Sequence, residues 1–299
     1  MKTREQLIDD LLTLAFAEDV GDGDATTLST IPADEKGRQQ LIVKEEGILA
    51  GVDVARMVFE KFDPSLEMTV FIGDGAKVKP GDVAFVVEGP VRSLLQTERV
   101  MLNIMQRMSG IATTTERYQS RLEGLNTKVL DTRKTTPGMR MLEKEAVKIG
   151  GGSNHRIGLF DMILIKDNHV DFAGGIPQAV QAAKDWCAAN GKNLQIELEV
   201  RNTEEIDQAL KAGVDRIMLD NFTPARTREA VARIRAYKAS EAQMAADPHT
   251  HNGVDVEIES SGGITIDTLR DYGECGVDFI SVGALTHSVK GLDMSFKAC

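Results

Sequence analysis

The sequence is poor in cysteine and lacks long apolar runs, and each shortage excludes a class of protein. Its 299 residues include three cysteines, Cys187, Cys275 and Cys299. So small and scattered a set argues against a disulfide framework or a cysteine-based metal site, and it favours a reducing, cytoplasmic location. No run of about 18 apolar residues occurs, so we expect no membrane span. The first 19 residues are charged throughout, and we expect no secretion signal there.

Aromatic residues and an excess of positive charge are also missing. Aromatics make up 5% of the chain, and 35 Lys and Arg stand against 46 Asp and Glu, for a net charge of −11. Without a basic stripe to neutralise phosphates, we expect no nucleic-acid partner. Apolar residues make up 42%, which is enough for the core of one large domain or two modest ones.

One segment departs from this acidic background. Residues 131–169 hold seven Lys and Arg against five Asp and Glu, a local charge of +2 in a chain of −11. Positive charge collected in one place draws anions. The segment therefore predicts a site for a small, strongly anionic ligand. Its basic residues are Arg133, Lys134, Arg140, Lys144, Lys148, Arg156 and Lys166, with His155 and His169 beside them.

Two patterns of apolar residues divide the chain into two parts. The first ~110 residues predict a mixed α+β domain, with helices at 4–17 and 52–62 and a long helix at 94–122. From Thr127 onward, short apolar strands alternate with helical patterns, which indicates a parallel sheet. Strands are expected at 127–131, 161–165, 194–200, 215–220, 255–260 and 277–283, and helices near 137–149, 176–189, 203–212, 223–238 and 265–274.

Six strands, with room for a seventh, favour a closed or nearly closed α/β barrel over a doubly wound open sheet. The segment 241–253 interrupts the alternation of strands and helices and predicts an inserted loop. Its His249 and His251 are a weak candidate pair of metal ligands.

Every expected strand of this second part ends in polar residues or glycine. Because catalytic groups of α/β barrels lie at the carboxyl ends of the strands, these ends predict the active face. They carry Asp131, Arg133 and Lys134; Lys166, Asp167, Asn168 and His169; Glu197 and Glu199; Asp220 and Asn221; Ser260, Ser261, Gly262 and Gly263; Gly283 and Ala284.

Several of these ends allow more than one interpretation. The glycines after the last two strands favour a phosphate ligand, although turns also use glycine freely. Glu199 and Asp220 fit either Mg²⁺ or simple pairing with lysines. Lys166 fits an anion clamp, a Schiff-base nucleophile or a plain surface lysine. Arg133 and Arg156 suit a carboxylate or phosphate, or structural ion pairs.

The motifs together resemble those of the quinolinate phosphoribosyltransferase family, over essentially the full length. They are ERVMLNIMQRMSGIATTT at 98–115, DTRKTTPGMR at 131–140, GGGSNHRIGLFDMILIKDNH at 150–169, LDNF at 219–222, ESSGGI at 259–264 and VGALTHS at 282–288. The resemblance implies an N-terminal domain over 1–112 and an incomplete barrel over 113–288. It also implies that the tail 289–299 packs back on the first domain.

The resemblance further implies a reaction and its residues. Quinolinate and phosphoribosyl pyrophosphate (PRPP) would give nicotinate mononucleotide, pyrophosphate and CO₂, with Mg²⁺ as the metal, in a cytoplasmic homodimer or higher oligomer. The implied quinolinate ligands are Arg133, His155, Arg156, Lys166 and, from the neighbouring subunit, Arg99. Those implied for PRPP are Lys134, Glu199, Asp220, Ser261, Gly262, Gly263 and Gly283, with Lys134, Lys166, Glu199 and Asp220 also implied as catalytic and Glu199 and Asp220 as the metal ligands.

Other functions remain open from the residues alone. A relative of the same fold could use another acceptor, as in the molybdenum-associated relative or a nicotinate phosphoribosyltransferase. A barrel lyase forming a Schiff base on Lys166 belongs to a second class. A non-catalytic scaffold is a third, but it has no need for polar groups at six strand ends.

Overall fold

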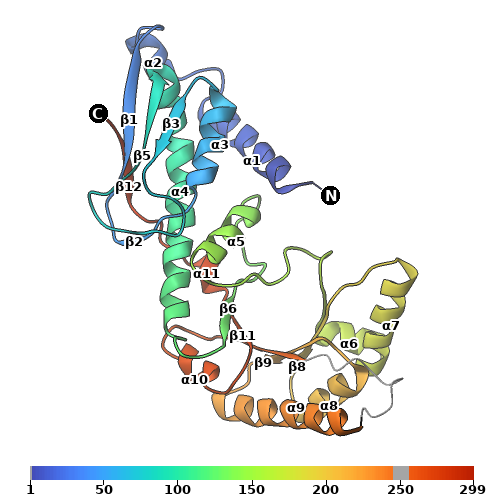
Figure 1. Cartoon of the computed structure of the whole chain (residues 1–299). Coiled ribbons are helices and arrows are strands. Elements are labelled where there is room, and N and C mark those ends of the chain that lie inside the picture. The colour runs from blue at the N-terminus through green and yellow to red at the C-terminus, as the bar shows by residue number, and fades with distance from the viewer. Residues whose placement is uncertain (1, 245–255) are drawn as a thin grey trace. The chain divides into compact units, whose positions relative to one another are not determined.

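The computed structural model describes residues 2–244 and 256–299, with side chains for all of these except 238–244. It divides into two compact units that interleave along the chain (Figure 1). The first unit comprises Met1–Arg117, Lys134–Gly152 and Gly283–Cys299, and the barrel unit comprises Tyr118–Arg133 and Ser153–Val282. The domain boundary expected near residue 112 stays a prediction. Residues 134–152, which lie between two segments of the barrel unit in the sequence, pack within the first unit, where Arg4 binds Glu145 at 2.7 Å.

An antiparallel sheet of four strands, in the order β12-β1-β5-β3, forms the centre of the first unit. The strands are β1 (Lys36–Val43), β3 (Glu67–Val70), β5 (Val83–Pro90) and β12 (Met294–Ala298). The rings of Phe59, Phe85 and Phe296 lie 6.0 to 6.2 Å apart in its core. Because β12 pairs with β1 and Phe296 joins this aromatic cluster, the end of the chain is part of the first unit.

Helices surround that sheet, and their ends follow ordinary capping rules. Thr3 and Gln6 form a capping box at the start of α1, and the Asp24 carboxylate caps α2. Gly110 faces the returning tail so closely that a Cβ there would lie 2.3 Å from the Lys290 carbonyl oxygen. The helices are α1 (Arg4–Asp19), α2 (Ala25–Thr30), α3 (Val52–Phe62), α4 (Val91–Ser120), α5 (Arg140–Ile149) and α11 (Ala284–His287), and a small ladder pairs β2 (Gly47–Ile48) with β4 (Lys77–Val78).

Six parallel strands form the barrel unit, in the order β6-β11-β10-β9-β8-β7. They are β6 (Lys128–Leu130), β7 (Ile163–Ile165), β8 (Ile196–Val200), β9 (Arg216–Asp220), β10 (Glu257–Ser261) and β11 (Phe279–Ser281), and the connecting helices are α6 (Asp167–Ala173), α7 (Ile176–Ala189), α8 (Thr203–Ala212), α9 (Pro224–Met244) and α10 (Leu269–Gly273). Neighbouring strands follow one another in the chain, except that the first strand, β6, pairs with the last, β11. This is expected for a barrel that is open between two adjacent strands.

The missing closure lies between β6 and β7. A single parallel bridge joins Leu130 to Ser153 there, so the segment that begins at Ser153 runs alongside β6. Among the described residues the sheet has six strands, and the possible seventh strand is not formed. The predicted incomplete α/β barrel with a separate α+β domain is confirmed.

The structure extends or leaves open some finer predictions. Helix α9 continues to Met244, whereas the sequence predicted an end near 238 and a loop from 241. The rest of that loop, with His249 and His251, lies outside the described residues.

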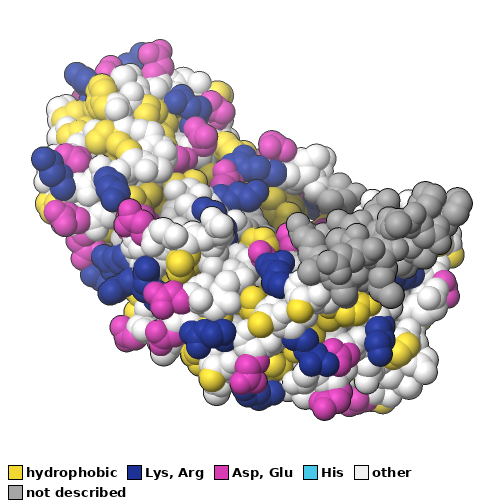
Figure 2. Space-filling model, turned by 60° about the horizontal axis from the view of Figure 1, so that its bottom comes forward, with side chains coloured by type: hydrophobic (Ala, Val, Ile, Leu, Met, Phe, Trp, Pro, Cys, Tyr) yellow, Lys and Arg dark blue, Asp and Glu magenta, His cyan; other side chains and the backbone are white. Residues whose placement is uncertain are grey.

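Among the described residues, no helix is long and apolar enough to cross a membrane. On the coloured part of the face in Figure 2, basic and acidic side chains are interspersed.

Candidate active site

The carboxyl ends of three neighbouring strands bring together a lysine and two carboxylates. Lys166 follows β7, Glu199 is the penultimate residue of β8, and Asp220 ends β9. The Lys166 Nζ lies 3.7 Å from Glu199 Oε2. Burial, and then the charge of Asp220, raise the pKa of Glu199 above its ordinary value, while Lys166 opposes the rise. We call Lys166, Glu199 and Asp220 the rim group. Its two carboxylates repel each other, which suits a cation or a polyhydroxyl ligand.

The end of β10, the next strand in the sheet, is connected to the rim group by hydrogen bonds of Asn221. Asn221 N–H donates to the Ser261 carbonyl at 2.9 Å, and Asn221 Nδ2 donates to Asp220 Oδ2 at 2.7 Å. Gly262 and Gly263 follow β10 with φ of 105° and 62°, in the region that favours glycine. The predicted phosphate-loop residues Ser261, Gly262 and Gly263 therefore lie beside the predicted acidic pair.

Two arginines lie at the same carboxyl edge, where the barrel is open. The bridge from Leu130 to Ser153 sets Arg156 at about the level of Arg133. Burial, and then the positive charge of Arg133, lower the pKa of Arg156. Two guanidinium groups close enough to disfavour each other's charge are stabilised by a bound anion, most simply a carboxylate.

A second set of charged residues lies beneath the rim, inside the barrel. We call His155, Glu197, Arg216 and Glu259 the buried layer, since all four are less than 8% exposed. Nε2 of His155 lies 3.0 Å from Glu197 Oε2 and 3.5 Å from Glu259 Oε2. Arg216 Nη1 lies 3.4 Å from Glu259 and 3.9 Å from Glu197, and its Nη2 pairs with Glu257 at 2.8 Å.

Burial dominates the chemistry of that layer. It raises the pKa of Glu197 to about 7 and, together with the charge of Glu197, that of Glu259 to about 8. Both oxygens of Glu197 and Oε1 of Glu259 lack an aligned hydrogen bond among the described residues, so the approach of His155 to Glu197 is an ion-pair distance only. Protons held on these carboxyls near neutral pH lower the cost of burying them.

His155, Glu197 and Glu259 also meet the spatial requirement for holding a metal ion, with one ligand atom each, all within 4.8 Å. Arg216 already faces both carboxylates, however, and supplies the positive charge that a cation would bring. We therefore assign no metal to the buried layer.

His155 connects the buried layer to the arginines. Its backbone N–H donates to the Asp131 carboxylate at 2.9 Å, and its Nδ1 accepts from the Arg156 N–H at 2.7 Å. The ring is 7% exposed, and both of its nitrogens face protein groups. The quinolinate role that the resemblance implies for His155 stays a prediction, and here the ring supports the loop that carries Arg156.

The remaining predicted site residues belong to the first unit. Lys134 and Gly283 lie together there, because Thr286 Oγ1 donates to the Lys134 carbonyl and a Cβ at Gly283 would lie 3.2 Å from Lys134 Cδ. The same Cβ would lie 3.0 Å from Nε2 of His287, which the sequence reading did not select. Arg99 is exposed on α4.

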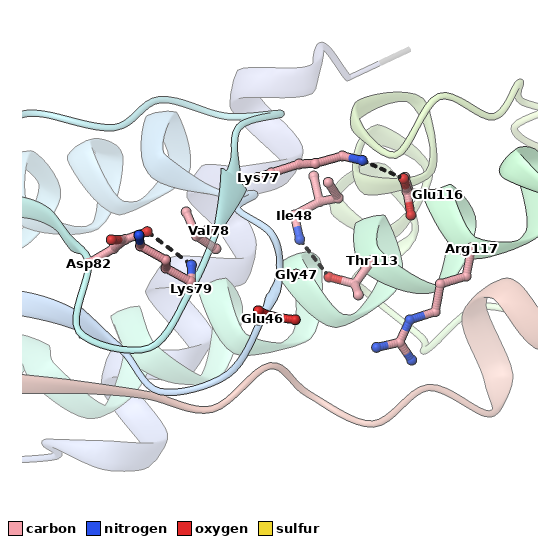
Figure 3. A pocket seen from close by; sticks show the side chains of 10 residues that line it. All are labelled: Glu46, Gly47, Ile48, Lys77, Val78, Lys79, Asp82, Thr113, Glu116 and Arg117. Atoms are coloured by element: carbon pink, nitrogen blue, oxygen red, sulfur yellow. Dashed lines mark hydrogen bonds and ion pairs between the residues drawn. The ribbon is translucent and has the colours of Figure 1, made fainter.

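The first unit also holds a pocket of about 560 Å³ that no predicted site residue lines (Figure 3). Two of its carboxylates already have partners. Lys77 pairs with Glu116 at 3.1 Å, and the Lys79 N–H donates to Asp82 at 2.9 Å. It has neither the strand ends nor the glycine turns of the barrel edge, and we assign it no chemistry.

Four residues now evident were missed or left without a role in the sequence reading: Asn221, Arg216, Glu259 and His287. One signal could have found two of them. Glutamates two apart occur on both β8 and β10, and an arginine begins the strand between them. Residues two apart share a face of a strand, so this pattern indicates paired charges inside the barrel.

Comparison with known families accounts for almost the whole chain. The profile described as quinolinate phosphoribosyl transferase, N-terminal domain, matches residues 24–109. The profile of the corresponding C-terminal domain matches residues 111–297.

Individual relatives match over similar lengths. Quinolinate phosphoribosyltransferase (decarboxylating) 1b of Nicotiana tabacum is 42% identical over 294 residues, which cover 96% of this chain and 81% of the relative. The probable nicotinate-nucleotide pyrophosphorylase (carboxylating) of Bacillus subtilis (strain 168) is 40% identical and covers 95% and 91%. The solved nicotinate-nucleotide pyrophosphorylase of Francisella tularensis superimposes with a TM-score of 0.87, at 38% identity, over 100% of this chain and 98% of that one.

Proposed function

The chain belongs to the quinolinate phosphoribosyltransferase family, and on that premise we propose that it transfers the phosphoribosyl group of PRPP to quinolinate. Quinolinate loses one carboxylate, and the products are nicotinate mononucleotide, pyrophosphate and CO₂, on the de novo route to NAD. The observation that carries the proposal is the meeting of paired arginines, Lys166 and two carboxylates at one edge of a parallel sheet.

The arginine side of the edge suits quinolinate, which carries two carboxylates. Arg133 and Arg156 present guanidinium groups that hold carboxylates in a bidentate manner, and the Lys166 ammonium adds a third cation. His155 is proposed in the same group, through its contact with the Arg156 backbone. Decarboxylation requires the 2-carboxylate to lose solvent, so we expect the arginines to hold the 3-carboxylate more firmly.

The acidic side suits the ribose and pyrophosphate of PRPP. Glu199 and Asp220 fit Mg²⁺, because burial and mutual repulsion leave Glu199 with a raised pKa that a nearby cation would relieve. When Mg²⁺ is bound with PRPP, the chemistry it supplies is neutralisation of the leaving pyrophosphate. Ser261, Gly262 and Gly263 supply backbone N–H groups for the 5′-phosphate. Lys134 and Gly283, in the first unit, are assigned to PRPP from their motifs.

The protein acts on this reaction mainly by holding and charge-stabilising the two substrates. Bond breaking at the ribose C1 develops positive charge, which Glu199 and Asp220 stabilise. The quinolinate nitrogen becomes a pyridinium after it bonds to C1. It then accepts the electron pair that the 2-carboxylate leaves behind as CO₂ departs, and a proton replaces the carboxylate on the ring. No covalent enzyme intermediate is required.

The Schiff-base alternative is weakened by the surroundings of Lys166. The Lys166 side chain is 50% exposed and its Nζ lies 3.7 Å from Glu199 Oε2, whereas a Schiff-base lysine is typically desolvated in an apolar pocket. Borohydride added with substrates should therefore leave no label on Lys166. A labelled lysine would favour the lyase.

A direct assay tests the proposed function. Purified protein is incubated with PRPP, Mg²⁺ and either quinolinate or nicotinate, and mononucleotide, pyrophosphate and CO₂ are followed together. We expect all three products with quinolinate only. Pyrophosphate with nicotinate, or no product with either acceptor, would instead favour the nicotinate enzyme or a relative with another acceptor.

A homodimer in which Arg99 completes the partner's site is also proposed, from the exposed position of Arg99 on α4 and the family motif. Mixing inactive Arg99→Ala and Lys166→Ala proteins should restore about a quarter of wild-type activity, because mixed dimers contain one intact site. No recovery after verified subunit exchange would place Arg99 in its own subunit's site or outside any site. The cytoplasmic location is likewise a proposal, since some relatives are chloroplastic or mitochondrial.

A further inference from the structure

Asn221 has a left-handed backbone, a conformation that is uncommon for residues other than glycine. Its φ is 54°, and it is the only non-glycine residue with positive φ in residues 2–244 and 256–299. Glycine reaches this left-handed region freely, while asparagine reaches it at some cost. A turn needed only for its shape is well served by glycine, so the side chain of Asn221 calls for an explanation.

The contacts of Asn221 supply that explanation. Its Nδ2 donates to Asp220 Oδ2 at 2.7 Å, and its backbone N–H donates to the Ser261 carbonyl at 2.9 Å. The amide orientation follows from the partner, because only the NH₂ end can donate to a carboxylate. Asp220 Oδ1 accepts no hydrogen bond from the described residues, so this oxygen remains available to a ligand.

Gly262 fits against the other side of the same amide. A Cβ on Gly262 would lie 2.2 Å from Asn221 Oδ1, 2.8 Å from its Cγ and 3.0 Å from its backbone nitrogen. No side chain fits there without moving Asn221. The amide is thus held between the Asp220 carboxylate and the first glycine of the turn after β10.

We propose that Asn221 is a positioning residue that sets the Asp220 carboxylate against the Ser261–Gly263 turn and so fixes the PRPP half of the site. This inference rests on the proposed function. Without the Nδ2 bond, the terminal torsion of Asp220 is broad and its carboxylate can turn toward Glu199 or solvent. The arginine side of the edge, proposed to bind quinolinate, follows other strand ends, so we expect quinolinate binding to be little affected.

Two substitutions separate the side chain from the backbone. Asn221→Gly keeps the left-handed turn at no conformational cost and removes the amide. Asn221→Asp keeps the shape but replaces the donor with a second carboxylate beside Asp220. The matched control is Asn190→Ala, which removes an equivalent Nδ2 bond to the Trp186 carbonyl at the end of α7, at the opposite end of the strands.

We expect Asn221→Gly to raise the KM for PRPP about tenfold and to leave the KM for quinolinate within about twofold. Asn221→Asp should raise the KM for PRPP further, and Asn190→Ala should change neither constant. A wild-type KM for PRPP in Asn221→Gly would overturn the proposal. So would an equal rise in both KM values with a lowered melting temperature, since that is the result of a purely structural role.

A crystal structure of Asn221→Gly gives a readout that does not depend on activity. The Asp220 carboxylate should turn away from its present position or lose its defined density, while Ser261 and Gly262 keep their backbone. An unmoved Asp220 carboxylate would contradict the inference. If the wild-type protein failed to use quinolinate, the proposed function would fall, and the position of Asp220 in this variant would still test Asn221.

Discussion

Two glutamates on one strand show how depth within the barrel divides the charged residues. Glu197 and Glu199 are two apart on β8 and face the same side. Glu197 is fully buried and faces His155 and Arg216, whereas Glu199 keeps 12% of its side chain exposed and faces Lys166 and Asp220. The deeper residue has its charge balanced by the protein, and the outer one has an incomplete set of partners that a ligand can complete.

The same division separates the rim group from the buried layer as wholes. A buried set of charges is costly and adds little net stability, but removing one member leaves a buried charge without its partner and is strongly destabilising. The buried layer therefore fits a role in supporting the strand ends and the Arg156 loop. Changes in the rim group should alter kinetics with little effect on stability, and changes in the buried layer should do the reverse.

The largest kinetic effect is expected from Lys166→Ala. Lys166 is proposed both to bind quinolinate and to act in catalysis, so its loss should lower kcat/KM about 1,000-fold with little change in melting temperature. Steady-state kinetics and calorimetry measure the two effects. Lys211→Ala, on the solvent face of α8, is the control. A change below about tenfold in Lys166→Ala would contradict its proposed role in the reaction.

Arg133→Ala tests whether the carboxyl edge of the barrel has an arginine side that binds quinolinate and a separate acidic side that binds PRPP. Loss of a bidentate carboxylate partner should raise the KM for quinolinate about 100-fold and leave that for PRPP nearly unchanged. Arg133→Lys should recover only part of the loss, because an ammonium lacks the planar fork. An unchanged KM for quinolinate would count against the role of Arg133 and against the separation of an arginine side from an acidic side.

Glu199→Gln and Glu197→Gln form the direct pair for the comparison. The first should raise the Mg²⁺ and PRPP requirements about tenfold, because Glu199 faces the ligand. The second should change the unfolding free energy and leave the KM for PRPP within about twofold. Parallel kinetics and urea unfolding measure both. If the two variants behaved alike, depth would not separate their roles.

The pH dependence of stability gives the smallest and most specific effect. Burial raises the pKa of Glu259 to about 8 from an ordinary 4.5, so between these values the folded state holds more protons than the unfolded state. The free energy of unfolding should therefore fall as pH rises through this window, by up to about 1.4 kcal/mol per pH unit for one such proton.

In the Glu259→Gln variant this side chain cannot ionise. Its free energy of unfolding should therefore fall less steeply as pH rises across the same window. Urea unfolding of both proteins at pH 5, 6, 7 and 8 supplies the comparison, and titratable groups outside the buried layer cancel in the difference. Parallel curves for the two proteins would mean that Glu259 does not hold a proton in the folded state.

Much of the fold and of the rim group could be predicted from the sequence, because both depend on local patterns. Alternating apolar strands and helices fix a parallel sheet, and polar residues after each strand mark its carboxyl edge. Lys166, Glu199 and Asp220 were found in this way, and the structure brings them together. Their substrate roles stay predictions, which came from the family motifs rather than from the strand pattern.

What could not be predicted depends on depth and on neighbouring strands. Arg216 occurs at the start of an apolar strand, and arginine is rarely buried, so its own strand does not mark its inward position and only the paired glutamates of the neighbouring strands do. The left-handed backbone of Asn221 lies where two strand ends meet, at Asp220 and Ser261, which are far apart along the chain. Short helices such as α2 and α6 lack enough residues for a clear period.

The most direct test of the account is a crystal structure of the protein with quinolinate bound. We predict that the two quinolinate carboxylates lie against Arg133, Arg156 and Lys166 at the carboxyl edge of the barrel, above the buried layer. Quinolinate bound in the first-unit pocket of Figure 3, or anywhere away from those three cations, would contradict it.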